Sequence, residues 1–152
     1  MNPAPATLLL LGVAFFSGGC AVQGRPFAKA VVPADRSVIY VYRPYHYGSS
    51  ALRPPVTCGD ETARIGPGGY HAFILPTEKV VCRVQTDSAD EIQLDAQPRV
   101  HYLREEFSWS GTLSEGQPRL NPIDTDAAQT EIQSCCVQEE TPAANSQSLP
   151  PN

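Results

Sequence analysis

The chain has 152 residues, and its 11 basic and 16 acidic side chains give a formal net charge of −5 at pH 7. The acidic excess lies after Ile123, because residues 124–152 carry acidic side chains and no basic ones, whereas residues 20–123 are balanced. A neutral body with an acidic end lacks the clustered Lys and Arg that nucleic acids and anionic membrane surfaces require, which argues against both as partners. The length fits one small domain with tails, and 15 prolines with 11 glycines favour a turn-rich β protein.

The N-terminal segment has the pattern of a secretory signal. The apolar run Leu8 to Phe16 has the length of a signal-peptide core and is far shorter than the roughly 20 residues that span a bilayer. Small residues follow at 17–19, and Cys20 then offers a thiol for lipid attachment. We therefore expect residues 1–19 to be a signal peptide and Cys20 to be acylated, so that its lipid anchors the mature protein in a membrane.

Two alternatives stay open for this segment. Ordinary signal cleavage would leave a soluble periplasmic protein with a free Cys20, because residues 17–19 are also small at the positions that such a peptidase reads. A chain that is not exported is the other alternative. Ala21, and not Asp, follows the cysteine. By resemblance to lipoproteins of Gram-negative bacteria, this implies sorting to the outer membrane. We expect the domain to face the periplasm, with the cell surface as the alternative.

Residues 20–36 are expected to form the lipid anchor and a flexible tether, because Gly24, Pro26 and Pro33 interrupt a segment with few periodic apolar residues. Residues 139–152 hold three prolines and one Leu among small and polar residues, so we expect a disordered tail. The folded domain is then predicted at 37–138.

Seven short strands are predicted between Gly, Pro and Asp turn signals. The best is Ser37–Arg43, which is rich in β-branched and aromatic residues and is ended by Pro44. Spacings near ten residues predict a mainly β fold, a small antiparallel β-sandwich. The other predicted strands are Val56–Cys58, Thr62–Ile65, Tyr70–Leu75, Val80–Thr86, Glu91–Leu94 and Arg99–Phe107.

One C-terminal helix is predicted at Thr125–Cys135. Asp124 or Thr125 can cap its first turn, where acidic residues are also favourable. Its buried face is expected to carry Ala128, Ile132 and Cys135.

Four motifs occur in a characteristic order along the chain: Val38–Pro44, Cys58–Asp60, Ile65–Tyr70 and His101–Glu105. Their order resembles a domain-of-unknown-function family of bacterial envelope lipoproteins, similar in layout to small sandwiches of the PEGA type. The resemblance covers about Val38 to Ser134 and implies the fold and an envelope location, with no established catalytic residues to transfer. The turn at 76–79 departs from the Pro-Gly that these domains commonly carry.

Four cysteines remain after Cys20, and an oxidising compartment allows three complete pairings of them. Cys58 shares a predicted strand face with Val56, and Cys82 shares one with its neighbouring valines, so Cys58–Cys82 is the favoured disulfide. It would close a loop of about 25 residues and contribute roughly 3 kcal/mol. The alternatives are that both are small apolar fillers or that one of them bridges to the helix.

Cys135 and Cys136 are disulfide candidates as well, but we expect them not to bond to each other. A disulfide between adjacent residues is strained, and on a helix the two side chains point about 100° apart. No Cys-x-x-Cys motif with a nearby His completes four ligands, so no metal or other cofactor is predicted.

Tyr45, His46 and Tyr47, in the loop before Pro55, form the candidate contact patch. The three histidines lack the short spacing of a metal trio, and Ser49-Ser50 beside His46 forms no catalytic motif, so no catalytic residue is predicted. Glu105 and Glu106 are expected to be a solvated pair.

The sequence thus favours a non-enzymatic accessory lipoprotein that binds another envelope protein or wall component. The alternative is a soluble or anchored periplasmic protein that binds a small ligand or a metal. A third hypothesis is a redox-active protein built on Cys135-Cys136.

Overall fold

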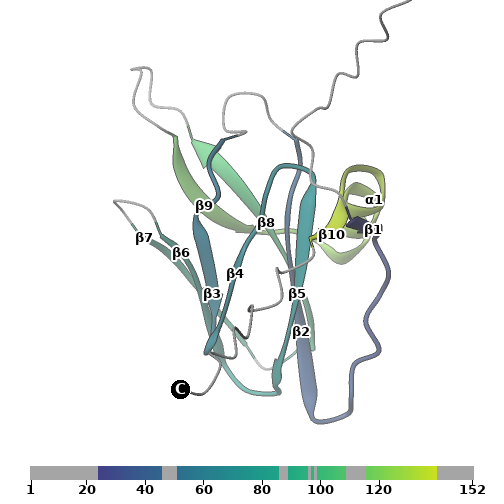
Figure 1. Cartoon of the computed structure of the whole chain (residues 1–152). Coiled ribbons are helices and arrows are strands. Elements are labelled where there is room, and N and C mark those ends of the chain that lie inside the picture. The colour runs from purple at the N-terminus through teal and green to yellow at the C-terminus, as the bar shows by residue number, and fades with distance from the viewer. Residues whose placement is uncertain are drawn as a thin grey trace, which may run out of the picture.

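Figure 1 shows the computed structural model of the chain, which describes residues 24–45, 51–85, 89–95, 97, 99–108 and 116–139. These residues form a mainly β fold with one C-terminal helix, as predicted, but the strands number ten and not seven. The elements are β1 (Gly24–Pro26), β2 (Arg36–Arg43), β3 (Pro55–Cys58), β4 (Glu61–Arg64), β5 (Gly69–Pro76), β6 (Val80–Gln85), β7 (Ala89–Leu94), β8 (Val100–Ser108), β9 (Gln117–Pro122), α1 (Thr125–Cys135) and β10 (Val137–Glu139).

The strands form two sheets. The large sheet has six strands in the order β1-β10-β5-β2-β8-β9, and the small sheet has four in the order β4-β3-β6-β7. In Figure 1 the small sheet lies on one side of the large sheet, while α1 lies beside β1 and β10 at the other side. The chain passes between the sheets several times, so neither sheet is a single continuous stretch of sequence.

The seven predicted strands correspond to β2–β8, with ends that differ by one or two residues. The prediction missed three strands. β1 and β10 have only three residues each and carry no periodic pattern of their own. β9 does alternate, with Pro118 and Leu120 buried and Gln117 and Arg119 exposed, but it contains two prolines, which weaken the sequence pattern of a strand. It tolerates them because it lies at the edge of the large sheet, where one side of a strand needs no ladder hydrogen bonds.

The prediction of an antiparallel arrangement is wrong for the large sheet, which is mixed. β2 runs parallel to β8, with Val38 opposite Val100 and Tyr42 opposite Arg104, and β10 runs parallel to β5. Parallel neighbours need a long crossover connection. The whole small sheet and β5 come between β2 and β8 in the chain and supply that connection.

Side chains from both sheets form one buried apolar cluster, the main core. The register explains its composition, because alternate residues of β2 point to opposite faces, so Ile39 and Val41 belong to this cluster whereas Val38 and Tyr40 do not. Burial of these side chains contributes roughly 1.5–3 kcal/mol each before the entropy cost of ordering the chain. The main core consists of Ile39, Val41, Val56, Cys58, Ile65, Phe73, Val80, Cys82, Val84, Leu94, Leu103 and Leu120.

The other face of the large sheet is covered by α1, whose predicted bounds are confirmed. The Asp124 side chain caps the helix by accepting a hydrogen bond from the Asp126 N–H at 3.0 Å. Ala128 and Ile132 are buried against tyrosines of the sheet, as predicted. Cys135 is only half-buried, and the next residue, Cys136, is buried in its place.

The N-terminal segment is part of the domain, which corrects the prediction of a tether through residue 36. β1 pairs antiparallel with β10, and Phe27 packs edge-on against Tyr40 and Tyr70. The Ala30 N–H donates a hydrogen bond of 2.7 Å to the Tyr40 hydroxyl. Residues 24–36 therefore belong to the folded domain. Residues 1–23, which include Cys20 and the predicted signal peptide, lie outside the described residues, as do residues 140–152 of the predicted tail; Glu139 ends β10.

The edge strands β7 and β9 are linked across the two sheets. The carboxylate of Asp90 on β7 accepts a hydrogen bond of 2.8 Å from the Leu120 N–H on β9. This N–H belongs to the side of β9 that has no strand partner, so the bond satisfies an edge donor and holds the two sheets together at that margin.

Candidate functional site

The structure contains the disulfide that the sequence favoured, between Cys58 on β3 and Cys82 on β6. The two residues lie directly opposite each other in an antiparallel pair, with Cα atoms 4.1 Å apart. The Gly59 N–H bonds to the Val81 carbonyl, so Cys58 and Cys82 occupy the neighbouring non-hydrogen-bonded position, where cross-strand side chains come closest. Both side chains are completely buried in the main core.

The expectation that Cys135 and Cys136 do not bond to each other is wrong, because the structure joins them in a disulfide. The expectation assumed that both residues are helical. The helix ends at Cys135, and Cys136 has extended backbone angles (φ −132°, ψ 142°), so the 100° helical separation of the two side chains does not apply. The bond therefore lies at the junction between α1 and β10.

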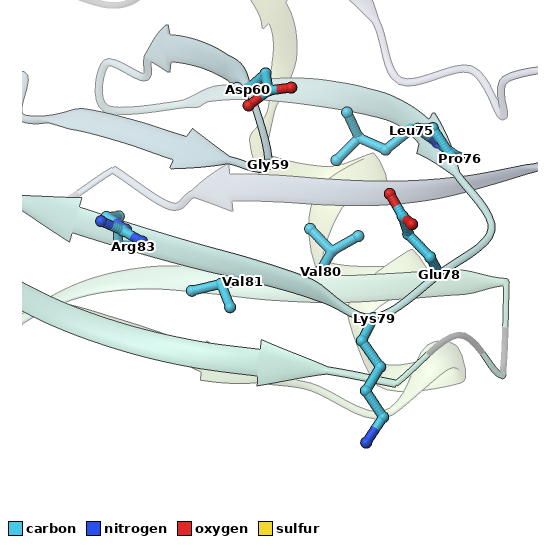
Figure 2. A pocket seen from close by; sticks show the side chains of 9 residues that line it. All are labelled: Gly59, Asp60, Leu75, Pro76, Glu78, Lys79, Val80, Val81 and Arg83. Carbon is cyan, nitrogen blue, oxygen red and sulfur yellow. The ribbon is translucent and has the colours of Figure 1, made fainter.

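A cleft of about 260 Å³ opens at one end of the fold, between the β3–β4 turn and the β5–β6 turn (Figure 2). Gly59 makes the first turn tight by adopting a positive φ of 57°, which side-chain-bearing residues avoid. Leu75, Val80 and Val81 supply an apolar lining. The other residues around the cleft are Gly59, Asp60, Pro76, Glu78, Lys79 and Arg83.

The basic side chains around the cleft have ion-pair partners, whereas its two carboxylates are available to a ligand. Lys79 extends away from Asp60 and Glu78 in Figure 2, and its Nζ lies 3.6 Å from a carboxylate oxygen of Asp95. Arg83 is likewise 3.7 Å from the carboxylate of Glu91. Within the described part of the chain, Asp60 and Glu78 have no ion-pair partner. The cleft thus offers an apolar lining beside two carboxylates, an arrangement that suits a small cationic ligand.

A polar network that the sequence did not predict ties α1 to the large sheet. The buried Tyr42 hydroxyl donates a hydrogen bond of 2.7 Å to Glu131, and Arg104 lies 3.2 Å from both oxygens of the same carboxylate. Arg104 also pairs with Glu106, whose other oxygen accepts from Asn121. Residues 42, 104 and 131 are far apart in the sequence, so no local sequence motif predicts that they form a network.

The pKa values of this network indicate a structural role. Burial raises the pKa of Tyr42, and the hydrogen bond and charge of Glu131 raise it further. Burial alone would lower the pKa of Arg104, but the charges of Glu106 and Glu131 outweigh it, and the net pKa is raised. Tyr42 therefore stays protonated and Arg104 stays charged throughout the ordinary pH range, so these two groups join helix to sheet without a change of charge.

Two charged side chains are buried on the core-facing side of the large sheet. Arg43 is 1% exposed, donates hydrogen bonds to the carbonyls of Leu52 and Ile65, and stacks over the Phe107 ring at 4.4 Å from its centroid. It thereby fixes the chain on either side of the β3–β4 hairpin to β2. Glu105 is 2% exposed, which corrects the prediction of a solvated pair with Glu106.

The predicted contact patch is only partly described. Tyr45 is 42% exposed, whereas His46 and Tyr47 lie outside the described residues. Tyr45 follows the end of β2 that pairs with Gly69, and the cleft lies at the other end of β2, where Arg36 pairs with Pro76. Eight residues of strand, about 26 Å, separate the two ends, so Tyr45 and the cleft lie on distinct surfaces.

The two described histidines have separate partners. His71 Nε2 lies 2.8 Å from a carboxylate oxygen of Glu61, and His101 Nε2 lies 3.0 Å from the Asp95 carbonyl. In the part of the chain that is placed, no group of three or more His, Cys, Asp or Glu side chains could hold a metal ion. The same residues include no helix that is long and apolar enough to span a membrane.

Comparison with known proteins gives no relative on which to base an assignment. No family model, no curated protein and no solved structure matches the chain. The cysteines and the cleft are therefore interpreted from their own geometry.

Proposed function

We propose that the protein is a lipid-anchored, non-enzymatic binding module of the bacterial cell envelope, held in the outer membrane through Cys20 with its domain in the periplasm. The disulfide state carries this proposal, because all four cysteines of the described domain are paired. Disulfides persist in oxidising compartments such as the periplasm and are rare in the cytosol. The apolar run before Cys20 independently suggests export and acylation.

The domain is proposed to be a β-sandwich seated close to the membrane surface. The shared main core of the two sheets supports the sandwich. Only residues 21–23 separate Cys20 from β1, and four extended residues span at most about 14 Å. A partner must then be recognised near the lipid headgroups, and the non-enzymatic role fits a small domain whose buried polar residues tie its elements together.

Mass spectrometry of the native protein tests the anchor. The membrane fraction of the native host should yield a chain that begins at Cys20 and is heavier than its sequence by the mass of the acyl groups. A Cys20→Ser variant should lose membrane association and keep the circular dichroism spectrum of the folded domain, because position 20 precedes β1. An unmodified chain in the soluble fraction would refute the lipid anchor.

The second candidate function is the binding of a small cationic ligand, and the cleft is the observation that favours it. Its apolar lining and the carboxylates of Asp60 and Glu78 match an amine or guanidinium group on a short aliphatic chain. Arginine methyl ester is a suitable probe, with glutamate as the anionic control.

An NMR titration tests ligand binding in the cleft separately from the lipid anchor. The probe should shift the amide signals of residues 59–60 and 78–81, and Asp60→Asn with Glu78→Gln should abolish these shifts. Shifts that are equal for glutamate, or that persist in the variant, would exclude a cation-binding cleft while leaving the envelope-anchored role intact.

A further inference from the structure

The two disulfides differ in how much they constrain the chain. Cys58 and Cys82 are 24 positions apart, so their bond removes many conformations of the unfolded chain. Cys135 and Cys136 are neighbours, and their bond closes a ring around a single peptide unit. Its effect on the unfolded chain is small, so chain entropy does not explain its presence.

The two disulfides also differ in access. Cys58 and Cys82 are both 0% exposed, because they are part of the main core. Cys136 is buried as well, but Cys135 is half-buried and is the most accessible of the four described cysteines. A thiolate attacks a disulfide sulfur along the line of the bond, from the side opposite the leaving sulfur. Because the leaving sulfur of Cys136 points into the fold, attack on Cys135 comes from the solvent side.

The surroundings of Cys136 suit a thiol as well as a disulfide. Its Sγ lies 3.8 Å from the Arg43 carbonyl oxygen, which can accept a hydrogen bond from an S–H group. The backbone on either side is held independently of the sulfur atoms. The Cys136 N–H donates to the Ile132 carbonyl, and the Val137 N–H donates to the Gly68 carbonyl. The S–S bond can therefore open without separating α1 or β10 from the fold.

We propose that Cys135–Cys136 is a thiol–disulfide exchange site that accepts two electrons from an external dithiol, whereas Cys58–Cys82 is a structural bond. One thiolate of the dithiol attacks the Cys135 sulfur, the S–S bond breaks, and Cys136 leaves as a thiolate that takes a proton from solvent. The second thiol of the dithiol then attacks the mixed disulfide and releases Cys135, which is protonated in turn. The dithiol becomes a disulfide by losing two electrons and two protons, and the cysteine pair gains them.

Graded reduction of the folded full-length chain with dithiothreitol tests this assignment. Free thiols are first alkylated under native conditions, and the remaining cysteines are alkylated with a heavy isotope reagent after unfolding and full reduction. Trypsin places Cys58 in peptide 37–64, Cys82 in 80–83 and both Cys135 and Cys136 in 120–152, since Arg-Pro bonds resist cleavage. Any label on Cys20 falls in a separate peptide.

We expect peptide 120–152 to take two light labels at dithiothreitol concentrations at least tenfold below those that label the other two peptides. The circular dichroism spectrum should stay native at this stage. A Cys135→Ser/Cys136→Ala variant should consume no dithiothreitol in the same range. Labelling of all three peptides together, or labelling of 120–152 only after the fold is lost, would overturn the proposal.

Discussion

Removal of the Cys58–Cys82 bond should cost a large part of the stability of a small domain. The chain-entropy model gives roughly 3.5 kcal/mol for a bond between residues 24 positions apart. Both sulfur atoms are fully buried, so a Cys58→Ala/Cys82→Ala variant also leaves a small cavity that adds about 1 kcal/mol. We therefore expect the free energy of unfolding to fall by about 4.5 kcal/mol, out of the roughly 5–15 kcal/mol typical of folded proteins.

Urea denaturation without reductant, followed by tyrosine fluorescence and circular dichroism, measures this loss. The melting temperature should fall by roughly 18 °C, taking about 4 °C for each kcal/mol in a domain of this size. Alanine is preferred to serine because a buried hydroxyl without a partner would add a separate penalty.

The matched control is Cys135→Ser/Cys136→Ala, which removes the other disulfide. Because that bond joins neighbours, its loss should lower the free energy of unfolding by less than about 2 kcal/mol. A loss in the control as large as that in the Cys58/Cys82 variant would refute the reasoning from loop length. A loss below about 1 kcal/mol in the Cys58/Cys82 variant would refute it as well.

Three further predictions concern the tyrosine network, the sheet edges and the N-terminal strand. Burial raises the pKa of Tyr42 in the folded state, whereas the unfolded chain ionises near pH 10. For this residue, stability should therefore fall by about 1 kcal/mol between pH 10 and 11, and urea denaturation at these two pH values should show a shallower fall for Tyr42→Phe. Asp90→Ala should lower the free energy of unfolding by about 1–2 kcal/mol, because the Leu120 N–H loses its acceptor. Asp90→Asn keeps an acceptor oxygen and should retain most of the stability. An equal loss of unfolding free energy in the two variants would contradict the hydrogen bond. A Cβ at Gly24 would collide with the Gln138 carbonyl oxygen, so Gly24→Ala should detach β1 from β10. Amide hydrogen exchange in β1 should become faster, while the main core keeps its protection against exchange. Unchanged exchange in β1 would argue against its pairing with β10.

The contacts that form the cleft and the polar network of α1 could be predicted from the sequence only in part. The Gly59-Asp60 turn was predictable, because glycine and aspartate between two β-type runs favour a tight hairpin. That this turn lies beside Glu78 was not, since the β3–β4 and β5–β6 connections meet only when the two sheets pack together. Tyr42 and Glu131 are likewise 89 positions apart, and only the packing of α1 on the large sheet brings them into contact.

The errors have physical causes of the same kind. β1 and β10 are too short to carry a pattern, and each exists because a neighbouring strand offers it hydrogen bonds. The burial of Glu105 follows from its place in β8, where alternation sends it towards the main core although its sequence neighbour Glu106 points outward. The adjacent cysteines could bond because the helix ended between them.

The sequence by itself determined the local structure, namely seven of the strands, the bounds of α1 and the tight turns, whereas it favoured the Cys58–Cys82 pair without deciding it. These features depend on residue period, turn chemistry and side-chain type within a few positions, which are written in the chain directly. Only the tertiary structure decided the mixed order of the large sheet, the docking of residues 24–36, the burial of Arg43 and the Cys135–Cys136 bond. Each of these depends on contacts between segments distant in the chain or on where one element gives way to the next, and such contacts are selected by the packing of the whole fold.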